Sequence, residues 1–175
     1  MRPKREYATK TGQTYMVTTE PWGGRSLFQT ERWAKLFIDT LYRYRGQAYL
    51  LHEFVVIPVH VHVLLTPKTG LEKAVQFNKG GFSYRAKKEL GSNMEVWQKG
   101  FQDHRIRDAS DYPIHVTYIH NNPVRKGLCE RPEEFPYSFA YPGFELDGVP
   151  QGLKPQSQSQ SNGAAKAAPL QNTTS

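Results

Sequence analysis

The sequence predicts an α+β domain with a ferredoxin-like antiparallel sheet and helices on one face, followed by a disordered C-terminal tail. Three observations predict this class. Four β-prone segments alternate with three helical segments in the order β-α-β-β-α-β-α, which is typical of split βαβ folds. Apolar residues make up 38% of the chain, which is enough for a core. Beyond residue 150 there is no aromatic and no acidic residue.

Residues 15–19 are aromatic and β-branched, and they predict a short first strand. Between residues 30 and 44 apolar side chains recur at helical spacing, and Thr30 offers an N-cap. Residues 49–57 and 60–66 are two apolar runs separated by Pro58. This pattern predicts a hairpin of two buried strands.

Residues 71–90 have a helical composition, but Gly80 and Gly81 interrupt them. Each glycine costs a helix about 1 kcal/mol relative to alanine, so we expect a break or kink there. Residues 97–106 predict a short strand or an irregular strand pair. A last helix begins at Ser110, and we expect Pro123 to end it.

Composition bounds the organisation of the chain. We expect residues 1–150 to form one domain and residues 151–175 a low-complexity tail, since the tail cannot bury enough apolar area to offset its ordering entropy. The net charge of the 175 residues is +7. The tail contributes two lysines and no acid, so residues 1–150 carry +5. This balance favours a polyanionic partner only weakly.

Several classes of protein are excluded. A single cysteine, Cys129, excludes an intramolecular disulfide framework and a Cys-rich zinc module. No apolar run approaches the roughly 20 residues that span a bilayer, and no apolar segment follows the basic residues 1–5. We therefore expect a cytoplasmic protein without a membrane partner.

Two histidines define the most informative strand. Side chains alternate along a strand, so His60 and His62 project from one face while Val61 and Val63 enter the core. Imidazoles about 7 Å apart at the backbone can converge on one divalent ion. Two solvent-facing histidines explain the pair equally well, so a metal site needs a third ligand and a reacting group.

A tyrosine and an asparagine supply that third ligand and reacting group. Tyr118 and Asn122 are four residues apart, so they lie on one face of the last helix, while Ile114 and Ile119 are expected on its buried side. A tyrosine at the edge of the core is the simpler interpretation of Tyr118. Two imidazoles and a carboxamide oxygen suit Mg²⁺ or Mn²⁺, which would help a phenol attack a phosphate.

These two stretches carry a family resemblance. His60-Val61-His62, followed by the run from Tyr118 to Leu128, resembles the single-tyrosine His-hydrophobic-His transposases. Within them it is most similar to the REP-associated tyrosine transposases, named for repetitive extragenic palindromes. Residues 79–83, 97–101 and 103–108 are also similar to connecting segments of that group, and the likeness runs from about residue 15 to about residue 141.

The resemblance implies a ferredoxin-like domain that nicks and rejoins single-stranded or hairpin DNA. Tyr118 would form a 5′-phosphotyrosine and free a 3′-hydroxyl, while His60, His62 and Asn122 match the family's metal ligands. Val59 stands where the family usually has asparagine. The alternative function is a non-catalytic or domesticated module that recognises palindromic repeats, and the chain is expected to act as a monomer or a homodimer.

Further basic groups complete the predicted site. We expect six of them to contact DNA phosphates: Lys79, Arg85, Arg105, Arg107, Arg125 and Lys126. Ordinary surface charge is the alternative interpretation of each. His104 and His115 are expected behind the metal site, where His115 could orient the phenol of Tyr118.

Overall fold

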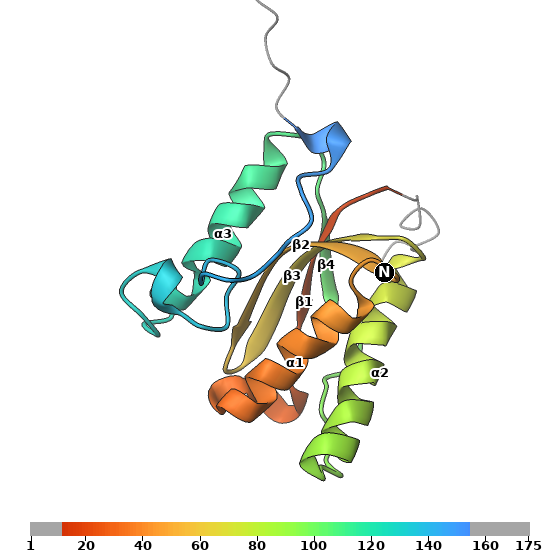
Figure 1. The fold of residues 1–175 in the computed structure, drawn as a ribbon, viewed down its shortest axis with the longest axis vertical. Coiled ribbons are helices and arrows are strands. Elements are labelled where there is room, and N and C mark those ends of the chain that lie inside the picture. The colour runs from red at the N-terminus through yellow and green to blue at the C-terminus, as the bar shows by residue number, and fades with distance from the viewer. Residues whose placement is uncertain (1–11, 155–175) are drawn as a thin grey trace, which may run out of the picture.

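The computed structural model describes residues 12–154 (Figure 1). Within them, one antiparallel sheet has the strand order β2-β3-β1-β4. The strands are β1 (Tyr15–Thr19), β2 (Tyr49–Ile57), β3 (His60–Pro67) and β4 (Gln102–Arg105). The helices are α1 (Glu31–Tyr44), α2 (Leu71–Leu90) and α3 (Asp111–Arg125). The predicted α+β class and element order are confirmed.

Helices α1 and α2 cover one face of the sheet and form the larger core with it (Figure 1). Phe28, Phe37, Phe82 and Trp97 contact one another there, with ring centroids 5.2–5.8 Å apart. Alternate strand residues such as Phe54 supply the sheet side of this core.

Helix α3 packs alone against the opposite face of the sheet. This position differs from the expectation that the helices share one face. The physical reason is that the β2–β3 hairpin is apolar on both faces, as strands covered on both sides usually are. Val55, Ile57 and Leu64 point toward α3, where they contact Ile119 in a second buried cluster.

Both predicted helix interruptions are wrong. Helix α2 runs unbroken through Gly80 and Gly81, and Gly81 lets α1 approach closely, because a Cβ there would lie 2.6 Å from the ring of Tyr44. Helix α3 continues through Pro123 to Arg125. Pro123 has no N–H, so the helix continues without the ladder bond to the carbonyl of Ile119.

Two smaller expectations are corrected, and the short strand expected within residues 97–106 is confirmed with narrower bounds. Ile119 is buried as expected, but Ile114 is 64% exposed. Only Gln102–Arg105 of residues 97–106 form a regular strand. Gln151–Leu153, at the start of the predicted tail, form a 3-10 turn, while residues 155–175 of that tail lie outside the described residues. Among the described helices, none has the length and apolar character needed to cross a membrane.

Candidate active site

Strand β3 presents both predicted histidines toward α3. His60 and His62 lie on the same face of β3 as Leu64, which belongs to the cluster under that helix. Their ring centroids are 4.6 Å apart, and the ring planes are inclined by 68°. His62 is buried, with 4% of its surface exposed, whereas His60 at the hairpin turn is partly exposed.

A threonine on the neighbouring strand fixes the His62 ring. Thr18 of β1 lies directly opposite His62 in the sheet register, and its Oγ1 is 2.8 Å from His62 Nδ1. When Nδ1–H donates to this hydroxyl, Nε2 carries the lone pair. A partner of this kind sets the tautomer and orientation of a metal-ligating histidine.

Both imidazoles are held in the neutral state that metal ligation requires. Burial, the nearby His60 and the charge of Lys126 lower the pKa of His62 to about 3. Burial and Lys126 also lower the pKa of His60, against a weaker opposing effect of Glu20. Because neither ring is protonated at neutral pH, no proton has to be displaced before a cation binds.

Tyr118 of α3 lies beside this pair. Its ring centroid is 5.3 Å from that of His62, and 37% of the residue is exposed. The guanidinium of Arg125 lies over the tyrosine ring, with Cζ 5.6 Å from the centroid. The phenol is therefore open to a ligand from solvent while its ring is held between a histidine and a cation.

Asn122 lies one helical turn beyond Tyr118 and is buried, with 3% exposure. Among the described residues, four buried side-chain atoms have no hydrogen-bond partner: Glu53 Oε2, His62 Nε2, Thr69 Oγ1 and Asn122 Oδ1. Buried polar atoms are rarely left unpaired. Two of these four are the nitrogen and the oxygen that a cation would take, so the predicted ligand set fits a divalent ion.

Two of the predicted DNA-binding residues adjoin the site. Arg125 and Lys126 are exposed at the C-terminal end of α3. The charge of Lys126 acts on both histidines, and Arg125 contacts Tyr118. Both cations therefore lie where a phosphate approaching the phenol would pass.

The structure does not bring Lys79 and Arg85 to this site. Both belong to α2, which packs on the opposite face of the sheet from α3. The Lys79 ammonium donates to the carbonyls of Gln98 and Gly100, at 2.7 and 2.5 Å. Arg85 forms a two-pronged ion pair with Glu89 at 2.6 and 3.1 Å. Their DNA-binding role stays a prediction.

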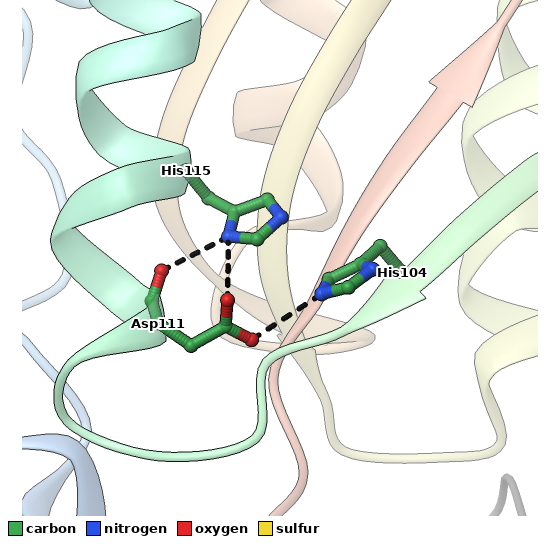
Figure 2. Close-up of side chains that lie close together, drawn as sticks. All are labelled: His104, Asp111 and His115. Carbon is green, nitrogen blue, oxygen red and sulfur yellow. Dashed lines mark hydrogen bonds and ion pairs between the residues drawn. The ribbon is translucent and has the colours of Figure 1, made fainter.

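His104 and His115 meet at a third residue, Asp111, as Figure 2 shows. The two rings are stacked at a centroid distance of 4.3 Å, and exposed Arg107 also contacts the Asp111 carboxylate. Arg105 is exposed on β4. Sequence reasoning missed Asp111, although its spacing of four residues from His115 on a helix was an available signal.

Sequence reasoning also missed Thr18. The first strand was predicted, but its register against the histidine strand was not, and only the register places the hydroxyl opposite His62. Alternation alone gives the face on which a residue lies and leaves its cross-strand neighbour undefined.

Fold and site together define a small α+β domain in which a His-hydrophobic-His strand faces a tyrosine on a helix. No protein-family profile matches the sequence. The chain is 27% identical over 139 residues to the REP-associated tyrosine transposase of Escherichia coli K12, covering 79% of this chain and 82% of that protein. The chain is also 32% identical over 102 residues to a protein of Haemophilus influenzae that is provisionally named a REP-associated tyrosine transposase. This match covers 47% of this chain and 54% of that protein.

A solved structure agrees with these relatives. It is a REP-associated tyrosine transposase bound to a REP hairpin, and it matches 90% of this chain and 100% of its own with a TM-score of 0.65 and 25% identity. The resemblance read from the sequence is therefore confirmed: in sequence and in fold the chain is similar to REP-associated tyrosine transposases. Both the Escherichia coli relative and the solved structure are named as transposases.

Proposed function

We propose that the protein is a DNA-nicking and strand-transferring transposase that acts on hairpin DNA formed by palindromic repeats. One observation carries this proposal. His62 Nε2 and Asn122 Oδ1 are both buried without a partner, and both residues adjoin a half-exposed tyrosine. Buried polar atoms are usually paired, and these two belong to residues of the predicted ligand set.

The proposed chemistry is a transesterification at phosphorus. The Tyr118 oxygen forms a bond to the phosphate, the bond from phosphorus to the 3′ oxygen breaks, and the 3′ oxygen leaves with a proton as a hydroxyl. The phenol hydroxyl gives its proton to solvent, and the leaving 3′ oxygen takes a proton from solvent. The product is a 5′-phosphotyrosine, which conserves the phosphodiester energy for rejoining.

His60, His62 and Asn122 would hold Mg²⁺ or Mn²⁺. When bound, such an ion polarises the phosphate and neutralises developing charge. Thr18 orients the His62 ring, and burial keeps both rings neutral. The two nitrogen ligands favour Mn²⁺ over Mg²⁺.

Two features support hairpin DNA as the substrate. The solved relative is bound to a REP hairpin, and Arg125 and Lys126 supply positive charge beside the phenol. A hollow of about 170 Å³ also borders the site, and it is lined by Thr18, Glu20 and residues 98–102. We expect the strand next to the cleaved phosphate to lie there.

We expect the nucleophile to act within its own chain, because Tyr118 and His62 of one chain already contact each other. A monomer is then sufficient for cleavage, and light scattering distinguishes it from a homodimer. The cytoplasmic location stays a prediction.

The test is covalent capture of DNA. The protein is incubated with a labelled single-stranded hairpin oligonucleotide and Mn²⁺ or Mg²⁺, and adducts are separated under denaturing conditions. We expect an adduct that Tyr118→Phe abolishes. Tyr84→Phe is the matched control, because Tyr84 is also exposed but lies on α2. A wild-type protein that binds the hairpin and forms no adduct would favour the alternative, a non-catalytic repeat-binding module.

A substitution at His60 tests whether the proposed residues hold a metal ion. His60→Ala should abolish the adduct while leaving hairpin affinity within about twofold, because the histidine holds the ion rather than the DNA backbone. Cleavage that survives this substitution would show that the metal assignment is wrong.

A further inference from the structure

We propose that His104, Asp111 and His115 form a second site for a divalent transition-metal ion, separate from the site at Tyr118. Strand β4 supplies His104, and the first two turns of α3 supply Asp111 and His115 (Figure 2). This inference does not depend on the proposed DNA cleavage.

The donor set fits such an ion. Two imidazoles and one carboxylate are the three protein ligands of many zinc and iron sites that keep a position open. One ligand atom from each residue lies within 4.8 Å of the others. His104 Nε2 is 3.2 Å from Asp111 Oδ2, and His115 Nδ1 is 3.4 Å from Asp111 Oδ1.

These separations are close to those of bound ligands. Zinc–nitrogen and zinc–oxygen bonds of about 2.0–2.2 Å place tetrahedral ligand atoms about 3–3.5 Å apart. The two nitrogen–oxygen distances lie in or near this range but involve different oxygens of the Asp111 carboxylate, so the imidazoles have to shift before they share one ion. His104 allows that movement, because 42% of its side chain is exposed and its ring can turn out of the stack with His115.

To free a ligand nitrogen, each imidazole would move its ring proton to its other nitrogen, so the rings release no proton to solvent. His115 Nδ1–H now donates to the Asp111 backbone carbonyl at 2.9 Å, and His104 Nε2–H donates to the Asp111 carboxylate at 3.2 Å. A metal takes the positions of these two hydrogens, and each neutral ring then carries its proton on its other nitrogen.

Arg107 is the competitor for the carboxylate. Its backbone N–H and its Nε donate to Asp111 Oδ2 at 3.0 and 3.4 Å. Burial alone would raise the pKa of Asp111, but the hydrogen bonds from Arg107 and His104 hold the pKa at about 2. The carboxylate is therefore an anion throughout the physiological range. The Arg107 side chain is 68% exposed and can swing away when an ion binds.

The second site is spatially distinct from the first. His104 and His62 belong to strands on either side of β1, and their registers on that strand differ by two residues, at Met16 and Thr18. An ion bound to His104, Asp111 and His115 would tie the start of α3 to the edge strand of the sheet. It would therefore hold the helix that carries Tyr118.

The experiment titrates the untagged full chain with Zn²⁺ by calorimetry and with Co²⁺ by visible absorption. It uses a His60→Ala, His62→Ala background so that only the second site reports. We expect one ion per chain, a visible Co²⁺ band and a thermal midpoint that rises with Zn²⁺. His104→Ala, a change at a half-exposed side chain, should abolish all three.

Arg107→Gln should tighten Zn²⁺ binding several-fold because it removes the competing guanidinium. Arg105→Gln, on the other face of β4, should leave the affinity unchanged. The proposal is overturned if the background variant binds no Zn²⁺, or if His104→Ala binds it as tightly. These outcomes do not depend on covalent DNA capture, so the two proposals fail separately.

Discussion

At the scale of single residues, one hydroxyl that is not itself a proposed ligand orients the predicted metal site. Thr18 Oγ1 bonds His62 Nδ1 at 2.8 Å and leaves the other ring nitrogen without a partner. Thr18 thereby determines that Nε2 of His62 is the nitrogen available to a cation. An imidazole with the opposite tautomer would present a proton to the cation instead.

Thr18→Val should raise the Mn²⁺ concentration for half-maximal adduct formation by about 10- to 100-fold, because an isosteric methyl cannot accept the His62 proton. Thr18→Ser keeps the hydroxyl and should restore most of the affinity. Equal effects of valine and serine would refute the orienting role. Thermal unfolding without metal checks that each variant folds.

Glu53 should make the stability of the fold fall as pH rises. Burial raises its pKa from 4.5 to about 8, and one carboxyl oxygen has no partner. A raised folded-state pKa gives stability that is present below about pH 4.5 and lost as pH rises through about 8.

Glu53→Gln should therefore stabilise the protein at pH 8 by about 1–3 kcal/mol and flatten this pH dependence. Chemical denaturation between about pH 5 and pH 9 measures the free energy of unfolding and its pH dependence for both proteins. Exposed Glu130→Gln is the matched control, and a slope that survives Glu53→Gln would assign the dependence to other groups.

At the scale of elements, helix α3 holds the nucleophile candidate, the amide ligand and the Asp111 cluster, whereas α1 and α2 serve the larger core. The packing of those two helices depends on one glycine. A Cβ at Gly81 would lie 2.6 Å from the Tyr44 ring, but at Gly80 it would meet nothing within 4 Å.

Gly80→Ala should stabilise the protein by up to about 1 kcal/mol, because alanine is the better helix former. Gly81→Ala should be less stable than Gly80→Ala by about 1–3 kcal/mol, because Tyr44 must leave its place on α2. Urea denaturation of the two variants compares them directly. Equal stabilities would mean that the Tyr44 ring moves without cost.

Sequence patterns predicted which residues share a local face, but they did not predict which face of a helix is buried or whether a helix is interrupted. The spacing of Tyr118 and Asn122 placed both on one helix, and alternation placed His60 and His62 on one strand face, since both relations are local. Ile114 was misplaced because periodicity does not identify which stripe of a short, mixed helix is buried. Gly80, Gly81 and Pro123 do not interrupt their helices, because the tertiary setting overrides propensity.

Contacts between different helices and strands could not be predicted from the sequence. The side of the sheet on which α3 packs depends on how the chain leaves β4, and the β2–β3 hairpin is apolar on both faces. The contact of Asp111 with His104 likewise needs the connection between β4 and α3, for which no composition signal exists.

At the scale of the whole molecule, the two faces of the sheet have different roles. One face supports the larger core with α1 and α2, and the other holds α3 and both histidine clusters. The formal charge of +7 is spread over the chain, so the position of a cation should matter more for DNA binding than the total.

Hairpin affinity should fall steeply between about 50 mM and about 200 mM salt, because bound phosphates release counterions. Lys126→Gln should weaken binding and reduce the slope of log affinity against log salt by about one. Lys35→Gln removes the same charge from α1, on the other face, and should change neither quantity. Fluorescence anisotropy measures both, and equal effects of the two lysines would place the DNA elsewhere.

The order of elements has a consequence for synthesis on the ribosome. Strands β1, β2 and β3 and both helices of the larger core precede α3 in the chain, so a nascent protein holds its histidine pair well before Tyr118 emerges. A truncated translation product that ends before α3 would lack the attacking phenol entirely. Under the proposed mechanism, unfinished chains would stay inert toward DNA until the last helix has docked.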